Sequence, residues 1–210
     1  MITQSNKDNL RKGLALLMSA FLFALLAGCG TVDDVTDDAL FADAFTGEVD
    51  EDLFIGVLVA DHPPVPDRKA LVVYLCDGAD VSTWLFGEAI GDTAVLEVAD
   101  TRVELSMNEG SAAGAVSQAG GAPQEFVAEF ATGDAGLYRA VETIDGQDYV
   151  GGWIVLNNLE QRGAITLGGQ VIENPTLDLT TGEAETSVGT FGTNCFRDPR
   201  TGERICRYLN

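Results

Sequence analysis

Over most of its length the chain is a series of short apolar or alternating runs separated by turn-forming residues. Residues 53–60 and 70–76 are almost continuously apolar, whereas residues 102–107 alternate, with Val103 and Leu105 between polar neighbours. Alternation with a period of two over many short runs is typical of antiparallel strands that have one buried and one solvated face. This pattern predicts an all-β domain rather than a fold built on long amphipathic helices.

Turn signals indicate where the predicted strands end. Asp145-Gly146 is a strong signal for a tight hairpin turn, and Asn157-Asn158 predicts the next turn along the chain. Residues 81–89 are expected to begin as a short helical turn that runs into a strand. Gly151-Gly152, in the middle of a predicted strand, predicts a bulge or a tight bend. A long succession of short strands with tight turns favours an antiparallel meander that forms a small barrel or a sandwich.

Four aromatic residues are candidates either for the core or for a ligand platform: Trp84, Tyr138, Tyr149 and Trp153. At alternate strand positions such side chains usually fill the core, and Trp153 in particular is expected to anchor it.

Cys76 lies in an apolar run and is expected to be a small buried residue. A catalytic thiol would instead need a basic neighbour.

The C-terminal residues carry a cysteine pair, Cys195 and Cys206, around a turn that Asp198-Pro199 begins and Gly202 completes. Counting back from this turn places the two cysteines opposite each other on paired strands. The sequence therefore predicts a disulfide-linked C-terminal hairpin, formed in an oxidising compartment. Because the hairpin is rich in arginine, it is expected either to dock on the acidic body of the protein or to bind an anionic partner such as lipid head groups or an acidic glycan.

The net charge of −21, from 12 basic and 33 acidic side chains, limits what this chain can bind. So much negative charge favours solubility and opposes association with nucleic acid. Acidic side chains are dense in residues 33–52, which contain no basic residue. Such a segment repels itself and stays extended, so residues 29–52 are expected to form an acidic tether ahead of the folded domain.

The first 28 residues have the layout of a secretory signal peptide. Lys7, Arg11 and Lys12 form a positive start, and residues 13–26 form an apolar run that is too short to span a membrane as a helix. Small residues then precede a cysteine, in Leu26-Ala27-Gly28-Cys29.

This Leu-Ala-Gly-Cys sequence resembles the lipobox of bacterial lipoproteins. The resemblance implies removal of residues 1–28, lipid modification of Cys29 and anchoring in a membrane of the cell envelope. In cells with two membranes, Gly30 implies the outer membrane, because an aspartate after the cysteine favours retention at the inner one. The alternatives are an ordinary secretory leader cut elsewhere, or an N-terminal helical anchor.

Catalytic and cofactor motifs are scarce in the sequence. His62 is the single histidine and lies in a proline-rich loop, which excludes a two-histidine metal site. Ser111 lacks the glycine pattern of a nucleophile elbow, and no phosphate-binding loop, dinucleotide fingerprint or zinc spacing occurs. The acidic pairs considered for hydrolysis are Asp77 with Asp80 and Glu125 with Glu129. Because carboxylates are so abundant, neither pair can be singled out, and the sequence predicts no cofactor, no metal, no catalytic residue and no enzymatic activity.

The pattern GLYRA…YVGGWIVL…QRGAI, preceded by YLCDG…W, resembles a β-domain of uncharacterised exported bacterial proteins and covers residues 53–167. That resemblance implies no activity. The predicted organisation is a signal peptide (1–28), an acidic tether (29–52), an antiparallel β-domain (53–168) and a C-terminal β extension with its hairpin (169–210). We expect a lipid-anchored cell-envelope protein whose non-enzymatic β-domain is structural or binds an envelope protein or glycan. The alternatives are a small-ligand-binding β-barrel and a carboxylate-based hydrolase.

Overall fold

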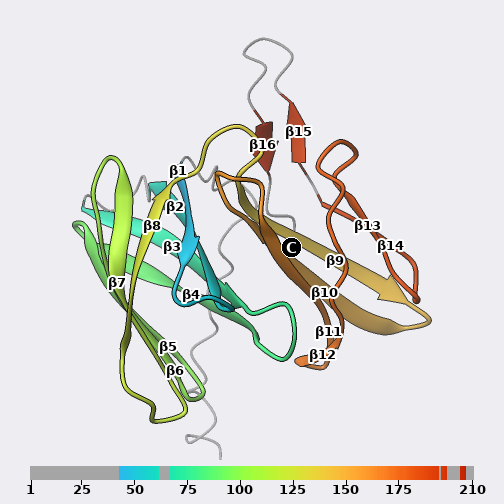
Figure 1. Cartoon of the computed structure of the whole chain (residues 1–210), viewed down its shortest axis with the longest axis horizontal. Coiled ribbons are helices and arrows are strands. Elements are labelled where there is room, and N and C mark those ends of the chain that lie inside the picture. The colour runs from blue at the N-terminus through green and yellow to red at the C-terminus, as the bar shows by residue number, and fades with distance from the viewer. Residues whose placement is uncertain (1–42, 62–66, 194, 198–203, 207–210) are drawn as a thin grey trace, which may run out of the picture. The chain divides into compact units, whose positions relative to one another are not determined.

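The computed structural model describes residues 43–61, 67–193, 195–197 and 204–206 (Figure 1). The regular elements in this part of the chain are all β-strands, so the predicted all-β class is confirmed. The described residues include no helix that is long and apolar enough to cross a membrane. The predictions for the signal peptide, Cys29 and His62 lie outside the described residues.

The first eight strands form a closed antiparallel barrel in which each strand pairs with the next one along the chain. They are β1 (Asp43–Glu48), β2 (Phe54–Asp61), β3 (Arg68–Cys76), β4 (Ser82–Ile90), β5 (Thr93–Val98), β6 (Thr101–Met107), β7 (Ser111–Gln118) and β8 (Gln124–Phe130). Pairing of β1 with β8 closes the barrel, and closure removes the exposed strand edges that an open sheet would have. The predicted meander is therefore confirmed, in its barrel form.

One cluster of buried apolar side chains fills the barrel interior. Ile55 and Val57 on β2, and Val103 and Leu105 on β6, belong to this cluster. In each strand every second residue points inward and its neighbours point outward. The period-two pattern of the sequence thus builds the barrel core directly.

A second antiparallel sheet packs against the outside of the barrel, in the strand order β12-β11-β10-β9. Its strands are β9 (Gly136–Ile144), β10 (Gln147–Val155), β11 (Gln161–Leu167) and β12 (Gln170–Glu173). The buried side chains that join barrel and sheet include Phe54, Leu58, Tyr74, Leu137 and Ile154. The two continuously apolar runs of the sequence are β2 and β3, because both faces of these strands are buried.

Glycines in the second sheet make room for large rings on both of its faces. A β-carbon on Gly152 would lie 2.6 Å from ring atoms of Tyr74 and Trp84, on the barrel side. On the opposite face, a β-carbon on Gly163 would overlap the ring of Trp153. The bulge expected at the mid-strand glycine pair is wrong, because β10 keeps a continuous register through both glycines. The glycines make room for aromatic rings.

The far face of the second sheet is covered by residues that follow it in the chain. A short hairpin of β13 (Glu183–Glu185) and β14 (Thr190–Gly192) contributes Phe191 to a buried cluster that also contains Trp153. Trp153 is fully buried, and its Nε1 donates a 2.9 Å hydrogen bond to the carbonyl oxygen of Pro175. Trp153 is a core anchor, as predicted.

Three expected boundaries differ from the structure. Residues 43–48, within the expected acidic tether, form β1, because Phe45 packs in the barrel interior at 3% exposure. Residues 82–90 are a strand throughout, without the expected helical turn at the start, since β4 pairs with β3 along its whole length. The barrel ends at β8, and β12 pairs with β11 across the boundary expected after residue 168.

The C-terminal hairpin is formed by β15 (Cys195–Arg197) and β16 (Arg204–Cys206). Cys195 lies directly opposite Cys206 in the register of these strands, as predicted. The disulfide bond between them stays a prediction, because the side chains of both strands lie outside what the structure describes.

Candidate functional site

The outer face of β5, β6, β7 and β8 is the candidate functional surface. The second sheet packs on the other half of the barrel, over β2 and β3. On the uncovered half, outward residues form rows that run across the strands. One row is Val95, Glu104, Ala115 and Glu125, and the next is Thr93, Ser106, Ala113 and Val127. Neighbours within a row lie about 5 Å apart, so each row is a continuous strip of surface.

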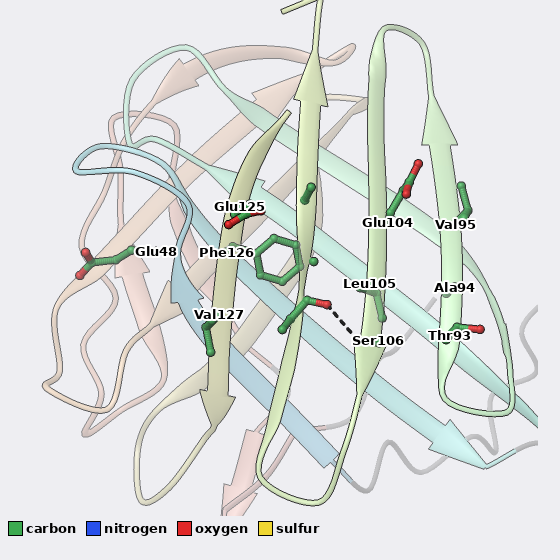
Figure 2. A pocket seen from close by; sticks show the side chains of 13 residues that line it. Glu48, Thr93, Ala94, Val95, Glu104, Leu105, Ser106, Glu125, Phe126 and Val127 are labelled. Carbon is green, nitrogen blue, oxygen red and sulfur yellow. Dashed lines mark hydrogen bonds between the residues drawn. The ribbon is translucent and has the colours of Figure 1, made fainter. Parts of the chain in front are cut away.

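The two rows line a shallow, open depression of about 770 Å³ (Figure 2). Its walls include Val95 on β5 and Val127 on β8, which are 54% and 60% exposed. Between them β7 contributes only the small residues Ala113, Gly114 and Ala115. Exposed apolar side chains around a concavity are typical of a surface that binds a partner, so this depression is a candidate binding site.

Gly114 shapes the floor of this depression. A β-carbon at this position would overlap the carbonyl oxygen of Glu104 and lie 2.8 Å from the Cα atom of Leu105 on β6. Glycine therefore lets β6 and β7 approach closely beneath the outer surface. Ser106 Oγ donates a 3.5 Å hydrogen bond to the carbonyl oxygen of Ala113 across the same two strands, drawn as a dashed line in Figure 2.

The rim of the depression is acidic. Its charged lining residues are Glu48, Glu104 and Glu125, and the described lining contains no basic side chain. Arg102, in the next row, donates hydrogen bonds to Glu104 and Glu97, and these two carboxylates raise the pKa of its guanidinium. Arg102 thereby neutralises part of the charge of Glu104, while Glu48 and Glu125 leave the rim with a surplus of negative charge.

A second depression, of about 430 Å³, is lined by the acidic residues Asp50, Glu51, Asp52 and Asp77. Asp77 Oδ1 accepts three successive backbone N–H groups, including that of Asp80, so this expected acid pair belongs to a turn. Asp50 Oδ1 accepts N–H groups from Leu53 and Asp52, which lower the pKa of its carboxyl. In the described part of the chain, no group of three or more His, Cys, Asp or Glu side chains is placed to hold a metal ion.

Among the other candidates for chemistry, Ser111 and Glu129 are register partners on β7 and β8, whereas Cys76 lies between the barrel and the second sheet. Cys76 is fully buried, as expected, and burial raises the pKa of its thiol. Ser111 Oγ forms hydrogen bonds with the Asn108 side chain in a turn. Glu125 and Glu129 both point outward from β8, but their Cα atoms lie about 13 Å apart along the strand. The structure brings no pair of the expected acids together across a cleft.

The aromatic candidates belong to the packing of the molecule. Trp84 is half-buried and stacks on Tyr74, with ring centroids 4.1 Å apart. The Arg139 guanidinium lies 5.5 Å from the Trp84 ring centroid, between the barrel and the second sheet. The remaining three are buried in the cluster on the far face of the second sheet: Tyr138, Tyr149 and Trp153.

Sequence reasoning did not single out the depression. The available signal was the run of small residues in 111–117, SAAGAVS, within an otherwise alternating β-domain. Small outward side chains in the middle of a sheet leave a low point between taller neighbours. From the sequence, Glu125 is a candidate only as the partner of Glu129 in an acid pair. Its row partners Glu104 and Val95 are distant in sequence, so the row could not be recognised from the sequence.

Comparison with known proteins found no family model, no curated protein and no solved structure that matches this chain. The functional conclusion therefore depends on the sequence and on the surface of the barrel.

Proposed function

We propose that this protein is a lipid-anchored cell-envelope protein whose barrel serves as a non-enzymatic binding module. The main support for the binding role is the depression on the uncovered face of β5–β8. There Val95 and Val127 remain exposed, although their strands belong to the closed barrel. The second sheet packs on the opposite half of the barrel. A rigid scaffold that presents one shaped face is suited to recognising a partner.

The anchor is proposed from the sequence. Cys29 follows an apolar run that ends in small residues, and its thiol would carry the lipid. Each buried methylene contributes about 0.8 kcal/mol, so two or three acyl chains hold a protein firmly where a single chain binds only marginally. Gly30 favours the outer membrane where the cell has two.

The non-enzymatic role is supported by the way reactive groups are used. Burial keeps the Cys76 thiol protonated, and Asp50 and Asp77 accept backbone N–H groups in turns. A nucleophile or general base needs a matched partner at hydrogen-bond distance in a cleft. These side chains stabilise the fold instead.

A second candidate function is the binding of a small apolar molecule inside the barrel, which the closed eight-stranded architecture favours. Against it, the apolar cluster of the interior packs side chains from both halves of the wall, including Phe45, Leu85 and Phe126. Native mass spectrometry of the protein purified from its producing cells tests this candidate. A bound apolar molecule of fixed mass would support the interior site over the outer depression.

The anchor is tested with the variant Cys29→Ser expressed in a bacterial host. We expect the wild-type protein to partition with membranes and to yield an acylated N-terminal peptide that starts at Cys29. The serine variant should keep its leader uncut and lose the acyl mass. Cys76→Ala is the matched control, since it removes a buried cysteine and should leave processing unchanged. Unaltered processing and fractionation of Cys29→Ser would contradict the proposal.

A further inference from the structure

Two carboxylates flank a small residue in one row of the depression. Glu104 and Glu125 are both register partners of Ala115, one on each neighbouring strand. Two strand spacings put their Cα atoms about 10 Å apart. A lysine or arginine side chain that enters above the Ala115 methyl group can therefore place its cationic end beside Glu125 and near Glu104, whose Oε1 already accepts hydrogen bonds from Arg102.

The adjacent row is uncharged. Ala113 lies between Ser106 on β6 and Val127 on β8. It is two residues from Ala115 on the same strand, which corresponds to about 7 Å. An apolar side chain placed over Ala113 would contact Val127, whose 60% exposure leaves most of that side chain available. The surface thus offers a cationic position and an apolar position side by side.

The length of the surface limits what can lie in it. From Val95 on β5 to Val127 on β8 there are three strand spacings, or about 14 Å. An extended chain advances about 3.3 Å per residue, so four to five residues cross the depression. A short extended segment of a polypeptide matches this span.

The charge of the surface selects the sign of the partner. The depression is lined by three glutamates and no basic residue among the described side chains, and the whole chain has a net charge of −21. A nucleic acid or an acidic glycan would be repelled. We infer that the depression binds a short extended segment of a partner protein that carries lysine or arginine next to apolar residues. This inference rests on the proposed binding role and names the class of partner.

The probes are three fluorescent nine-residue peptides in which valine alternates with arginine, glutamine or glutamate. Binding to the purified full-length protein in a neutral detergent is measured by fluorescence anisotropy. The arginine peptide should bind best and the glutamate peptide worst. Raising the salt concentration should weaken binding of the arginine peptide, because screening acts on exposed charges.

Two variants test the location, each with a matched control on another part of the surface. Ala115→Arg fills the space between the glutamates with a positive charge and should weaken binding of the arginine peptide more than about tenfold. Gln170→Arg adds the same charge on β12 of the second sheet and should have little effect. Glu125→Gln should weaken binding about threefold, whereas Glu183→Gln on β13 should leave it unchanged. Circular dichroism establishes that each variant is folded.

The outcomes separate this inference from the proposed function. Preferential binding of the arginine peptide that Ala115→Arg abolishes supports both. If the glutamine or glutamate peptide binds as well and Ala115→Arg still abolishes binding, the depression is a binding site but the basic partner is wrong. If Ala115→Arg and Gln170→Arg behave alike, or if the wild-type protein binds no peptide, the inference is overturned, while the anchor is still judged by Cys29→Ser.

Discussion

The two halves of the barrel wall differ in what lies outside them. The outward side chains of β2 and β3, such as Val72 and Tyr74, are buried beneath the second sheet, whereas those of β5 and β8, such as Val95 and Val127, are exposed. The first pair of strands is continuously apolar in sequence apart from Asp61, Arg68 and Lys69 at the strand ends, and the second pair alternates. A strand that is buried on both faces loses its polar alternation. The covered half of the barrel therefore differs from the open half in sequence pattern.

Aromatic residues provide the strongest test of this comparison. Tyr74 is fully buried between the barrel and the second sheet, whereas Phe86, on the outward side of β4, is 52% exposed. We expect Tyr74→Ala to lower the free energy of unfolding by about 3–5 kcal/mol, because it removes a large buried ring and leaves a cavity. Phe86→Ala should cost less than about 1 kcal/mol. Urea unfolding of the two variants measures both values, and similar costs would mean that the second sheet does not cover the barrel as described.

A pair of valines compares the two halves with side chains of equal size. Val72 on β3 is 3% exposed and Val127 on β8 is 60% exposed, and both point away from the barrel interior. Val72→Ala should destabilise the protein by about 2 kcal/mol through lost apolar burial and a small cavity. Val127→Ala should change stability by less than about 0.5 kcal/mol. Thermal unfolding compares the two directly, and a larger loss for Val127→Ala would reverse the assignment of covered and open halves.

The smallest expected effect concerns an exposed turn and depends on pH. The N–H groups of Leu53 and Asp52 lower the pKa of Asp50, so folding favours its ionised form. This stabilisation is complete above the unfolded-state pKa of about 4 and is lost as the pH falls through the lower folded-state pKa. Asp50→Asn should therefore cost no more than about 1 kcal/mol at neutral pH, because solvent screens an exposed carboxylate.

Unfolding curves recorded between neutral and strongly acidic pH test this effect. The difference between wild type and Asp50→Asn should shrink as the pH falls below about 4. Glu51→Gln, at the neighbouring position, serves as the control for a general loss of negative charge. A difference between wild type and Asp50→Asn that does not change with pH would show that the hydrogen bonds, rather than the charge, account for the effect.

Much of the fold could be predicted from local patterns. The Asp145-Gly146 turn is confirmed, with both residues at positive φ and Ile144 paired with Gln147. The position of Trp153 in the core is also confirmed. Each of these features depends on residues that are close in sequence, such as a dipeptide with a turn preference or a large ring in an apolar strand.

Other features could not be read from local patterns. The acidic composition around β1 predicts a tether and gives no sign that Phe45 belongs to the core. Phe45 packs in the barrel interior, and its pairing with Phe130 helps to close the barrel. The glycine pair of β10 predicts a bulge or a tight bend by local pattern, whereas the aromatic rings that occupy the space at Gly152 come from the distant strands β3 and β4. In both cases the decisive contact is made by a residue far away in the chain.

Residue period and turn chemistry are local properties, so the sequence was enough to predict a meander of antiparallel strands. The burial of β2 and β3 on both faces, the closure of the wall by β1 and the row of Glu104, Ala115 and Glu125 became visible in the folded domain alone. Such adjacency depends on the register between strands and on barrel closure. These are set by packing across the whole domain and leave no mark on any single segment.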